Sequence, residues 1–221
     1  TFFLWVAWAG FAFCYYGTIL VVTMVFAEID EDADNNPANG EDAEYQFDYG
    51  AILASACSEI AGTTIVLCLI DRVGRIPTQA VSYTLGGCMV CALCFLANNS
   101  ASRASLIIAG FLARMAFMSA SCTTWVSTAE ILTTDIRTTG HSAANAIARL
   151  GGSASPFLIS RASLSWTGSI LLVTSVITAM ASLKLPETNG KSMGAGAAET
   201  EMSSSIQKEE ATKNTSPYGI I

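Results

Sequence analysis

Three ionisable side chains, Glu59, Arg114 and Arg149, stand inside long apolar stretches of this sequence. Each lies about ten residues from the start of its stretch, which is roughly 15 Å along a helix axis. A charge at the centre of a membrane helix costs about 2.5 to 3.5 kcal/mol on insertion scales, so such residues face protein or a watery cavity. Substrate sites of transporters lie at that depth. We therefore expect these three residues to bind a substrate or to couple its movement to a proton.

The balance of these charges leaves alternatives open. Glu59 could form a purely structural ion pair with one arginine. One glutamate cannot neutralise two arginines, however. The remaining positive charge indicates an anionic substrate, a proton-coupling role for Glu59, or a partner carboxylate on helices outside this chain.

The surrounding composition is that of a membrane protein rather than of a large soluble core. Of 221 residues, 52% are hydrophobic and 13% charged, whereas soluble domains have about 25% charged residues. Backbone polar groups must be paired in lipid, and short alternating barrel strands do not fit the long runs, so each run is predicted to be a helix. Six membrane-spanning helices are predicted, at about 2–27, 49–70, 77–97, 104–128, 138–160 and 164–184, within one domain, 1–188.

The basic residues predict the orientation. Seven Lys and Arg residues fall on the side of the 71–76 and 129–137 loops and the tail, against two on the other side, which places the tail in the cytoplasm. Residues 28–48, which hold nine of the eighteen acids, then form an acidic extracytoplasmic loop. Asn98, in Asn-Asn-Ser, is a glycosylation candidate on that side. Residues 189–221 are predicted to be a disordered cytoplasmic tail.

Other chemistry has little support in the sequence. All seven cysteines lie in apolar segments, and we interpret Cys88, Cys91 and Cys94 as packing residues rather than metal ligands. His141 is the only histidine, and no nucleophile surrounds it. No enzyme activity, cofactor or metal is therefore expected. Since the acids form one loop, a nucleic-acid partner is not expected either.

Two mixed-charge clusters lie in the predicted cytoplasmic loops. Asp71, Arg72, Gly74 and Arg75 follow the second span, and the second cluster contains Glu130, Asp135 and Arg137. Solvated loop charges are the simplest interpretation of either run. Their repetition on one face favours a paired cluster at the ends of the helices.

These runs resemble motifs of the major facilitator superfamily. Asp-Arg-Val-Gly-Arg at 71–75 is similar to its loop signature. The run 129–140 resembles its Glu, Arg, Gly pattern after helix ten, and Pro-Glu-Thr-Asn-Gly-Lys at 186–191 looks like the exit of helix twelve in sugar porters and organic-ion relatives. Their order matches helices seven to twelve over residues 1–193. The resemblance implies an all-α membrane protein that forms the six-helix C-terminal half of a twelve-helix transporter.

A narrower resemblance is to organic-ion and SVOP-like transporters, through Tyr15-Tyr16, Ser58-Glu59 and the run from Ala148 to Phe157. It implies that Tyr15 and Tyr16 line the cavity, and that arginine at 149 accompanies anion carriers. The cytoplasmic gate would comprise Asp71, Arg72, Gly74, Arg75, Glu130 and Arg137. Thr133-Thr134 in place of Pro-Thr, and Ile76 in place of a basic residue, depart from the pattern.

The resulting hypothesis is a secondary active transporter of small organic ions, with anions preferred, or of polar metabolites, working by alternating access. Its partners would be an N-terminal six-helix half, a proton and the bilayer of the plasma membrane or of an intracellular vesicle or organelle. Because the sequence begins at Thr1 inside an apolar run, we interpret it as a truncated polypeptide. The alternatives are a half-length membrane protein with a binding or regulatory role, and a fragment of a sugar/H⁺ symporter.

Overall fold

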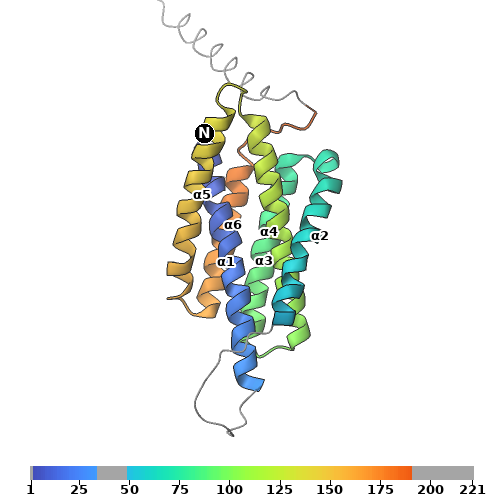
Figure 1. Ribbon diagram of the computed structural model, residues 1–221, viewed down its shortest axis with the longest axis vertical. Coiled ribbons are helices and arrows are strands. Elements are labelled where there is room, and N and C mark those ends of the chain that lie inside the picture. Colours follow the sequence, from blue (N-terminus) through green and yellow to red (C-terminus); the bar gives the residue numbers. More distant parts are fainter. Residues whose placement is uncertain (1, 34–48, 191–221) are drawn as a thin grey trace, which may run out of the picture.

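The computed structural model describes residues 2–33 and 49–190, and within them it contains six α-helices and no strand (Figure 1). The helices are α1 (Phe2–Ala33), α2 (Tyr49–Val73), α3 (Arg75–Asn98), α4 (Arg103–Ile131), α5 (Arg137–Ile159) and α6 (Leu164–Ser182). The all-α fold is therefore as predicted, and a helix covers each of the six apolar segments.

Five of the six helices have the length and apolar composition of membrane spans: α1, α2, α3, α4 and α6. The predicted fifth span, 138–160, does not meet that composition, since α5 carries Arg137, His141, Asn145 and Arg149 along one side. It is still 23 residues long, about 35 Å at 1.5 Å per residue. This helix has one polar side and one apolar side, as a helix beside a watery cavity would.

The first helix is longer than expected. It continues to Ala33, so residues 28–33, predicted to begin the acidic loop, are helical. The physical reason is that no glycine or proline interrupts residues 18–36. The rest of that predicted loop, 34–48, and residues 191–221 of the predicted disordered tail lie outside the described residues.

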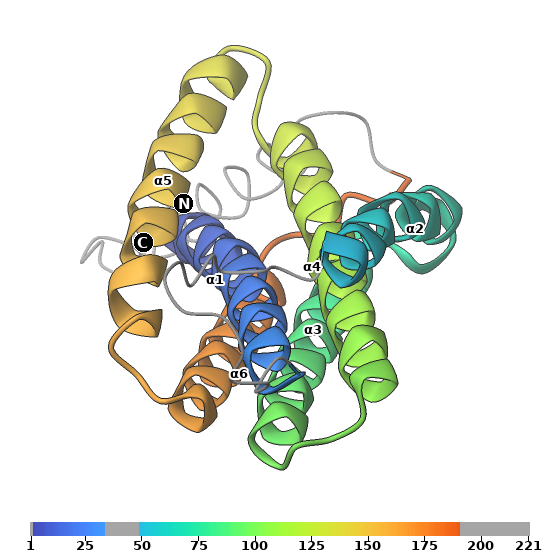
Figure 2. The ribbon, with the colours of Figure 1, turned by 60° about the horizontal axis from the view of Figure 1, so that its bottom comes forward.

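Helix α1 occupies the middle of the bundle. It packs against α4, α5 and α6, while α3 packs against α4 and α6 and α2 mainly against α4. Figure 2 shows α1 with α5 on one side and α4 on the other, and α2 beyond α4. Consecutive helices run in opposite directions, so the α2–α3 and α4–α5 connections lie at the end where α1 begins (Figure 1). The α3–α4 and α5–α6 connections lie at the opposite end.

Close backbone approach holds α5 against α1. A Cβ atom on Gly151 would lie 2.3 Å from the carbonyl oxygen of Ala9, so a larger residue would separate the two helices. Without a hydrophobic driving force between helices in lipid, such small-residue contacts supply the packing. Buried hydrogen bonds add to it between α3 and α4, where Gln79 and Tyr83 both bond to Thr124 at 2.8 Å.

Candidate functional site

An ion pair joins the middle of α2 to the middle of α4. The guanidinium of Arg114 is bonded to the carboxylate of Glu59. Tyr15 of α1 donates its hydroxyl hydrogen to Oε1 of the same carboxylate at 3.2 Å, and Nη1 of Arg114 donates to the hydroxyl of Ser55 at 3.4 Å. Three helices thus contribute to one polar centre at the depth where lipid would surround an outward-facing charge.

This polar centre has unused bonding capacity. The Nε–H of Arg114 is buried and has no hydrogen-bond partner among the described residues. The Glu59 side chain remains 29% exposed, against 11% for Arg114. A guanidinium has five N–H donors and binds carboxylates through two parallel bonds. Arg114 can therefore hold a second acceptor beside Glu59, or exchange Glu59 for another carboxylate.

The tyrosine pair lies next to this centre on α1. The rings of Tyr15 and Tyr16 meet edge to face, with centroids 5.5 Å apart. Tyr16 is 51% exposed, and a Cβ atom on Gly152 of α5 would lie 2.8 Å from its ring. The structure thus brings Tyr15 into contact with Glu59 and Tyr16 into contact with Tyr15, and that the two tyrosines line a substrate cavity stays a prediction.

Arg149 is separate from the ion pair. It is exposed, and no described carboxylate lies within ion-pair distance of it. Arg149 precedes Gly152 by three residues, so the two lie about one turn apart on the same face of α5. Of the two arginines that the sequence left open as partners of Glu59, the structure selects Arg114 and leaves Arg149 as a cation without a described counter-ion.

A second polar cluster lies at the end of the bundle where α1 begins, around Arg75. The Arg75 guanidinium bonds to both carboxylate oxygens of Glu130, with Nε–Oε2 at 3.0 Å and Nη2–Oε1 at 3.2 Å. Its Nη1 lies 3.0 Å from Oδ1 of Asp71 and donates to Oδ1 of Asn189 at 2.8 Å. This Arg75 cluster joins the α2–α3 turn, the end of α4 and the segment after α6.

The segment after α6 contributes residues that the sequence analysis quoted only as part of a motif. The carboxylate of Glu187 accepts the backbone N–H of Arg75 at 3.0 Å and that of Ile76 at 2.9 Å. These are N–H groups of the first turn of α3, which have no partner inside the helix, and a carboxylate is favoured there by the helix dipole. The Pro-Glu-Thr sequence was the signal that could have placed Glu187 in the cluster.

The other predicted gate residues have different surroundings. Gly74 has φ +104° and lies against the Glu187 carboxylate, which a Cβ atom would approach to 3.1 Å. Arg72 is exposed. Arg137 donates to the backbone carbonyl of Leu132 at 3.4 Å and makes no described ion pair with Glu130. The structure thus brings Asp71, Arg75 and Glu130 together, whereas Arg72 and Arg137 lie outside their ion-pair network.

An aromatic cluster that sequence analysis missed joins α1, α4 and α5. The indole N–H of Trp8 donates to Oγ1 of Thr128 at 2.9 Å. The ring centroids of Trp125 and His141 lie 4.7 Å apart. The Trp8 centroid lies 4.9 Å from that of Trp125 and 5.1 Å from that of His141. His141 is therefore a packing partner of two tryptophans, and no periodic signal in the sequence indicates it.

Comparison with known proteins gives the family. The sequence profile described as "Sugar (and other) transporter" matches residues 41–195, which contain α2 to α6. The chain belongs to this transporter family. The predicted resemblance to the major facilitator superfamily is thereby confirmed, and with it an all-α, multi-pass membrane protein. The family is one of transporters rather than of enzymes.

Individual relatives are consistent with this membership. The chain is 31% identical over 202 residues to "Putative transporter svop-1" of Caenorhabditis elegans, covering 87% of this chain and 38% of the relative. It is 30% identical over 205 residues to the synaptic vesicle 2-related protein of Xenopus laevis, with 87% and 37% covered. "Organic cation/carnitine transporter 7" of Arabidopsis thaliana is 26% identical over 160 residues, 72% of this chain and 30% of that protein. The chain spans less than two fifths of the length of these relatives.

The remaining candidates can be placed within this transporter fold. Asn98 is the last residue of α3 and is exposed, at the end of the bundle opposite the Arg75 cluster. Its glycosylation stays a prediction. Among the described residues, no group of three or more His, Cys, Asp or Glu is arranged to hold a metal. Cys88, Cys91 and Cys94 are free thiols on successive turns of α3, exposed, half-buried and buried in that order.

Proposed function

We propose that this chain is the C-terminal half of a secondary active transporter that moves small organic anions by alternating access. The observation that carries the proposal is the polar centre at the middle of the bundle, in which Glu59 is bonded to both Arg114 and Tyr15, together with Arg149 of α5, which has no described counter-ion. The two arginines exceed the one carboxylate, so the half carries a net positive charge at the depth of transporter substrate sites.

In this mechanism Glu59 and the substrate compete for Arg114. While Glu59 is ionised, its carboxylate occupies the guanidinium. Protonation of Glu59 removes its negative charge and leaves Arg114 free to bind a substrate carboxylate through two parallel hydrogen bonds. A proton and an organic anion would then enter and leave together. Arg149 and the exposed ring of Tyr16 would complete the binding surface on the α5 side.

The second wall of the cavity would come from an N-terminal six-helix half, as two related halves that rock about a central site require. We place the end that carries the Arg75 cluster on the cytoplasmic side, because Lys and Arg are concentrated there. The bonds from Arg75 to Glu130 and from Glu187 to α3 would hold this end in one of the two alternating states. The membrane that houses the protein is either the plasma membrane or that of a vesicle or organelle.

The test is uptake by the full polypeptide in proteoliposomes, with radiolabelled monocarboxylates, dicarboxylates, organic cations and a hexose as separate arms. We expect uptake of an anion, lowered about tenfold or more by Arg149→Gln and largely retained in Arg149→Lys. Arg103→Gln, which removes the arginine at the first residue of α4, is the matched control. Uptake of cations alone would contradict the proposal.

A hexose is the second candidate substrate, because the matching family profile is described as "Sugar (and other) transporter". Hexose uptake that is insensitive to Arg149→Gln would favour it. The absence of any uptake by a well-folded full polypeptide would instead favour a binding or regulatory role.

A further inference from the structure

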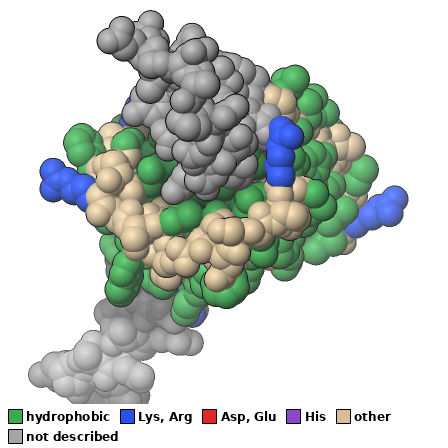
Figure 3. Space-filling model, turned by 90° about the horizontal axis from the view of Figure 1, so that it is seen from below, with side chains coloured by type: hydrophobic (Ala, Val, Ile, Leu, Met, Phe, Trp, Pro, Cys, Tyr) green, Lys and Arg blue, Asp and Glu red, His purple; other side chains and the backbone are tan. Residues whose placement is uncertain are grey.

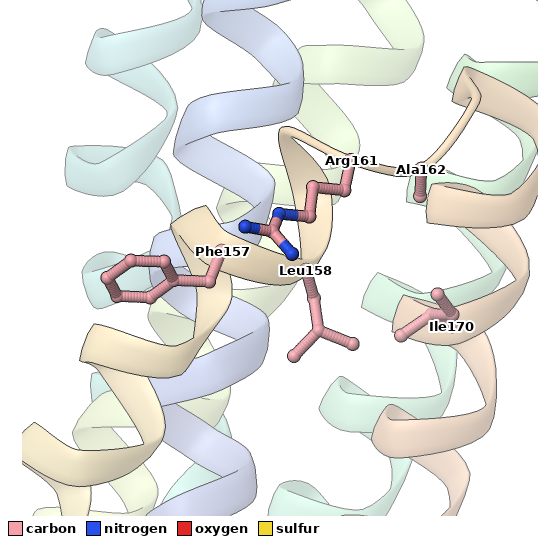
Figure 4. Close-up of a pocket in the computed structure, with 5 residues that line it drawn as sticks. All are labelled: Phe157, Leu158, Arg161, Ala162 and Ile170. Atoms are coloured by element: carbon pink, nitrogen blue, oxygen red, sulfur yellow. The ribbon is translucent and has the colours of Figure 1, made fainter.

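A groove lies between the last turn of α5 and the first turns of α6, at the end of the bundle opposite the Arg75 cluster. It has a volume of about 470 Å³ and is lined by Phe157, Leu158, Arg161, Ala162 and Ile170. Figure 4 shows Leu158 of α5 and Ile170 of α6 extending into the space between the helices, with the guanidinium of Arg161 turned back toward Phe157. The groove is therefore apolar along one part and cationic at one edge.

The groove exists because α5 and α6 pack against α1 rather than closely against one another. Pro156 contributes to the end of α5, because it cannot donate a backbone hydrogen bond to the carbonyl of Gly152. The hydroxyl of Ser155 donates to that carbonyl at 2.9 Å instead. In the turn that leads to Phe157 and Leu158, a side chain thus replaces the missing backbone donor.

The side chains around the groove are exposed on the described surface. Phe157 is 71% exposed and Leu158 is 46% exposed, as expected of residues that contact lipid in a membrane-spanning bundle. Trp166 is 69% exposed and precedes Ile170 by four residues, so it lies one turn nearer the helix end on the same face of α6. Exposed tryptophan near a helix end is typical of the membrane–water interface.

Among the described residues, Arg161 is the only cation that lines the groove, and it forms no ion pair with a carboxylate of that part of the chain. Figure 3 views the bundle from this end: basic side chains stand apart at the rim, and the described part of the surface between them is apolar or neutral. An arginine at a membrane interface keeps its guanidinium at the level of the lipid headgroups, where a phosphate can bind it.

We propose that this groove binds an anionic phospholipid, with the headgroup phosphate on Arg161 and an acyl chain along Leu158 and Ile170. This ligand would contact both parts of the groove, the apolar wall and the arginine. A soluble anion would use Arg161 and leave the apolar wall unfilled, and so would a carboxylate of the chain's own acidic segment. A lipid without net charge would fill the wall and also offer a phosphate, but it would bring its own headgroup cation next to Arg161.

The experiment uses the fluorescence of Trp166, which stands beside the groove. The full polypeptide is reconstituted in phosphatidylcholine vesicles that contain increasing fractions of dibrominated phosphatidylglycerol, and quenching is compared between the wild type and Trp166→Phe to isolate the Trp166 signal. We expect quenching at bromolipid fractions severalfold lower than with dibrominated phosphatidylcholine.

Three variants test the assignment. Arg161→Gln should abolish the preference for phosphatidylglycerol, Arg161→Lys should keep most of it, and Ile170→Phe, which fills the groove, should weaken quenching by both lipids. Arg103→Gln is the control for an arginine at the same end of the bundle that does not line the groove. Equal quenching of the wild type by the two bromolipids, or an equal loss in Arg103→Gln, would overturn the proposal.

Discussion

The hydroxyl of Thr188 donates a hydrogen bond to Oε2 of Glu130 at 2.5 Å. Thr188 lies beyond the end of α6 and is 5% exposed, whereas Glu130 lies in the last turn of α4. The same carboxylate receives the guanidinium of Arg75. One glutamate therefore holds both the start of α3 and the segment after α6, which makes this segment part of the bundle.

Replacing Thr188 by valine keeps the shape of the side chain and removes the donor. A hydrogen bond to a charged group contributes about 1.5 to 3 kcal/mol, so we expect Thr188→Val to lower the thermal midpoint of the purified protein. Thr139→Val, at an exposed position in the first turn of α5, should leave it nearly unchanged. Equal midpoints for the two variants would show that the bond contributes nothing.

Gly74 makes the turn between α2 and α3 possible. Its φ of +104° and ψ of 162° lie in a region that is essentially restricted to glycine. We expect Gly74→Ala to destabilise the protein by about 1 to 3 kcal/mol. Gly110→Ala is the control, because a Cβ there would meet only ordinary contacts, the nearest at 3.6 Å, and alanine is favoured over glycine inside a helix. Chemical denaturation in detergent measures both; a Gly74→Ala protein as stable as the wild type would contradict this account.

Glu59→Gln mimics the permanently protonated glutamate. If Glu59 and substrate compete for Arg114, a pH gradient should no longer accelerate anion uptake by this variant. We expect its uptake rate under the gradient to be roughly tenfold below that of the wild type, which is equivalent to about 1.4 kcal/mol. It should retain exchange of labelled for unlabelled anion, because exchange needs no net proton movement. Proteoliposomes with and without an imposed pH gradient separate the two activities. Loss of both together, with normal membrane abundance, would instead support a structural ion pair.

The hydrogen bond between Trp8 and Thr128 predicts a difference between two tryptophans. Trp8 is fully buried, and its indole N–H is bonded at 2.9 Å. Trp8→Phe leaves the Thr128 hydroxyl without this donor and removes buried ring atoms, so we expect a loss of about 2 to 4 kcal/mol. Trp166→Phe, at a 69% exposed position, should change the free energy of unfolding by less than about 0.5 kcal/mol. Thermal unfolding of both variants decides whether burial accounts for the difference.

The glutamate and arginines inside apolar segments show how far the sequence leads at the candidate site. Their depth follows from counting residues along a helix, since each residue rises by a fixed 1.5 Å. Which arginine meets Glu59 does not follow, because that depends on how α2, α4 and α5 are placed around α1. The structure selects Arg114, and it leaves Arg149 exposed on α5.

The length and composition of its apolar runs, by themselves, determined that this is a multi-pass, all-α membrane protein, because lipid leaves the backbone no alternative to helices. Its short charged motifs also determined the family. Only the tertiary structure decided that Glu187 bonds to the start of α3, that Trp8 meets His141, and that a groove with Arg161 at its edge opens between α5 and α6. Each of these joins residues far apart in the chain, or depends on two neighbouring helices that do not pack together. Packing of whole helices sets such distances, and no local periodicity encodes them.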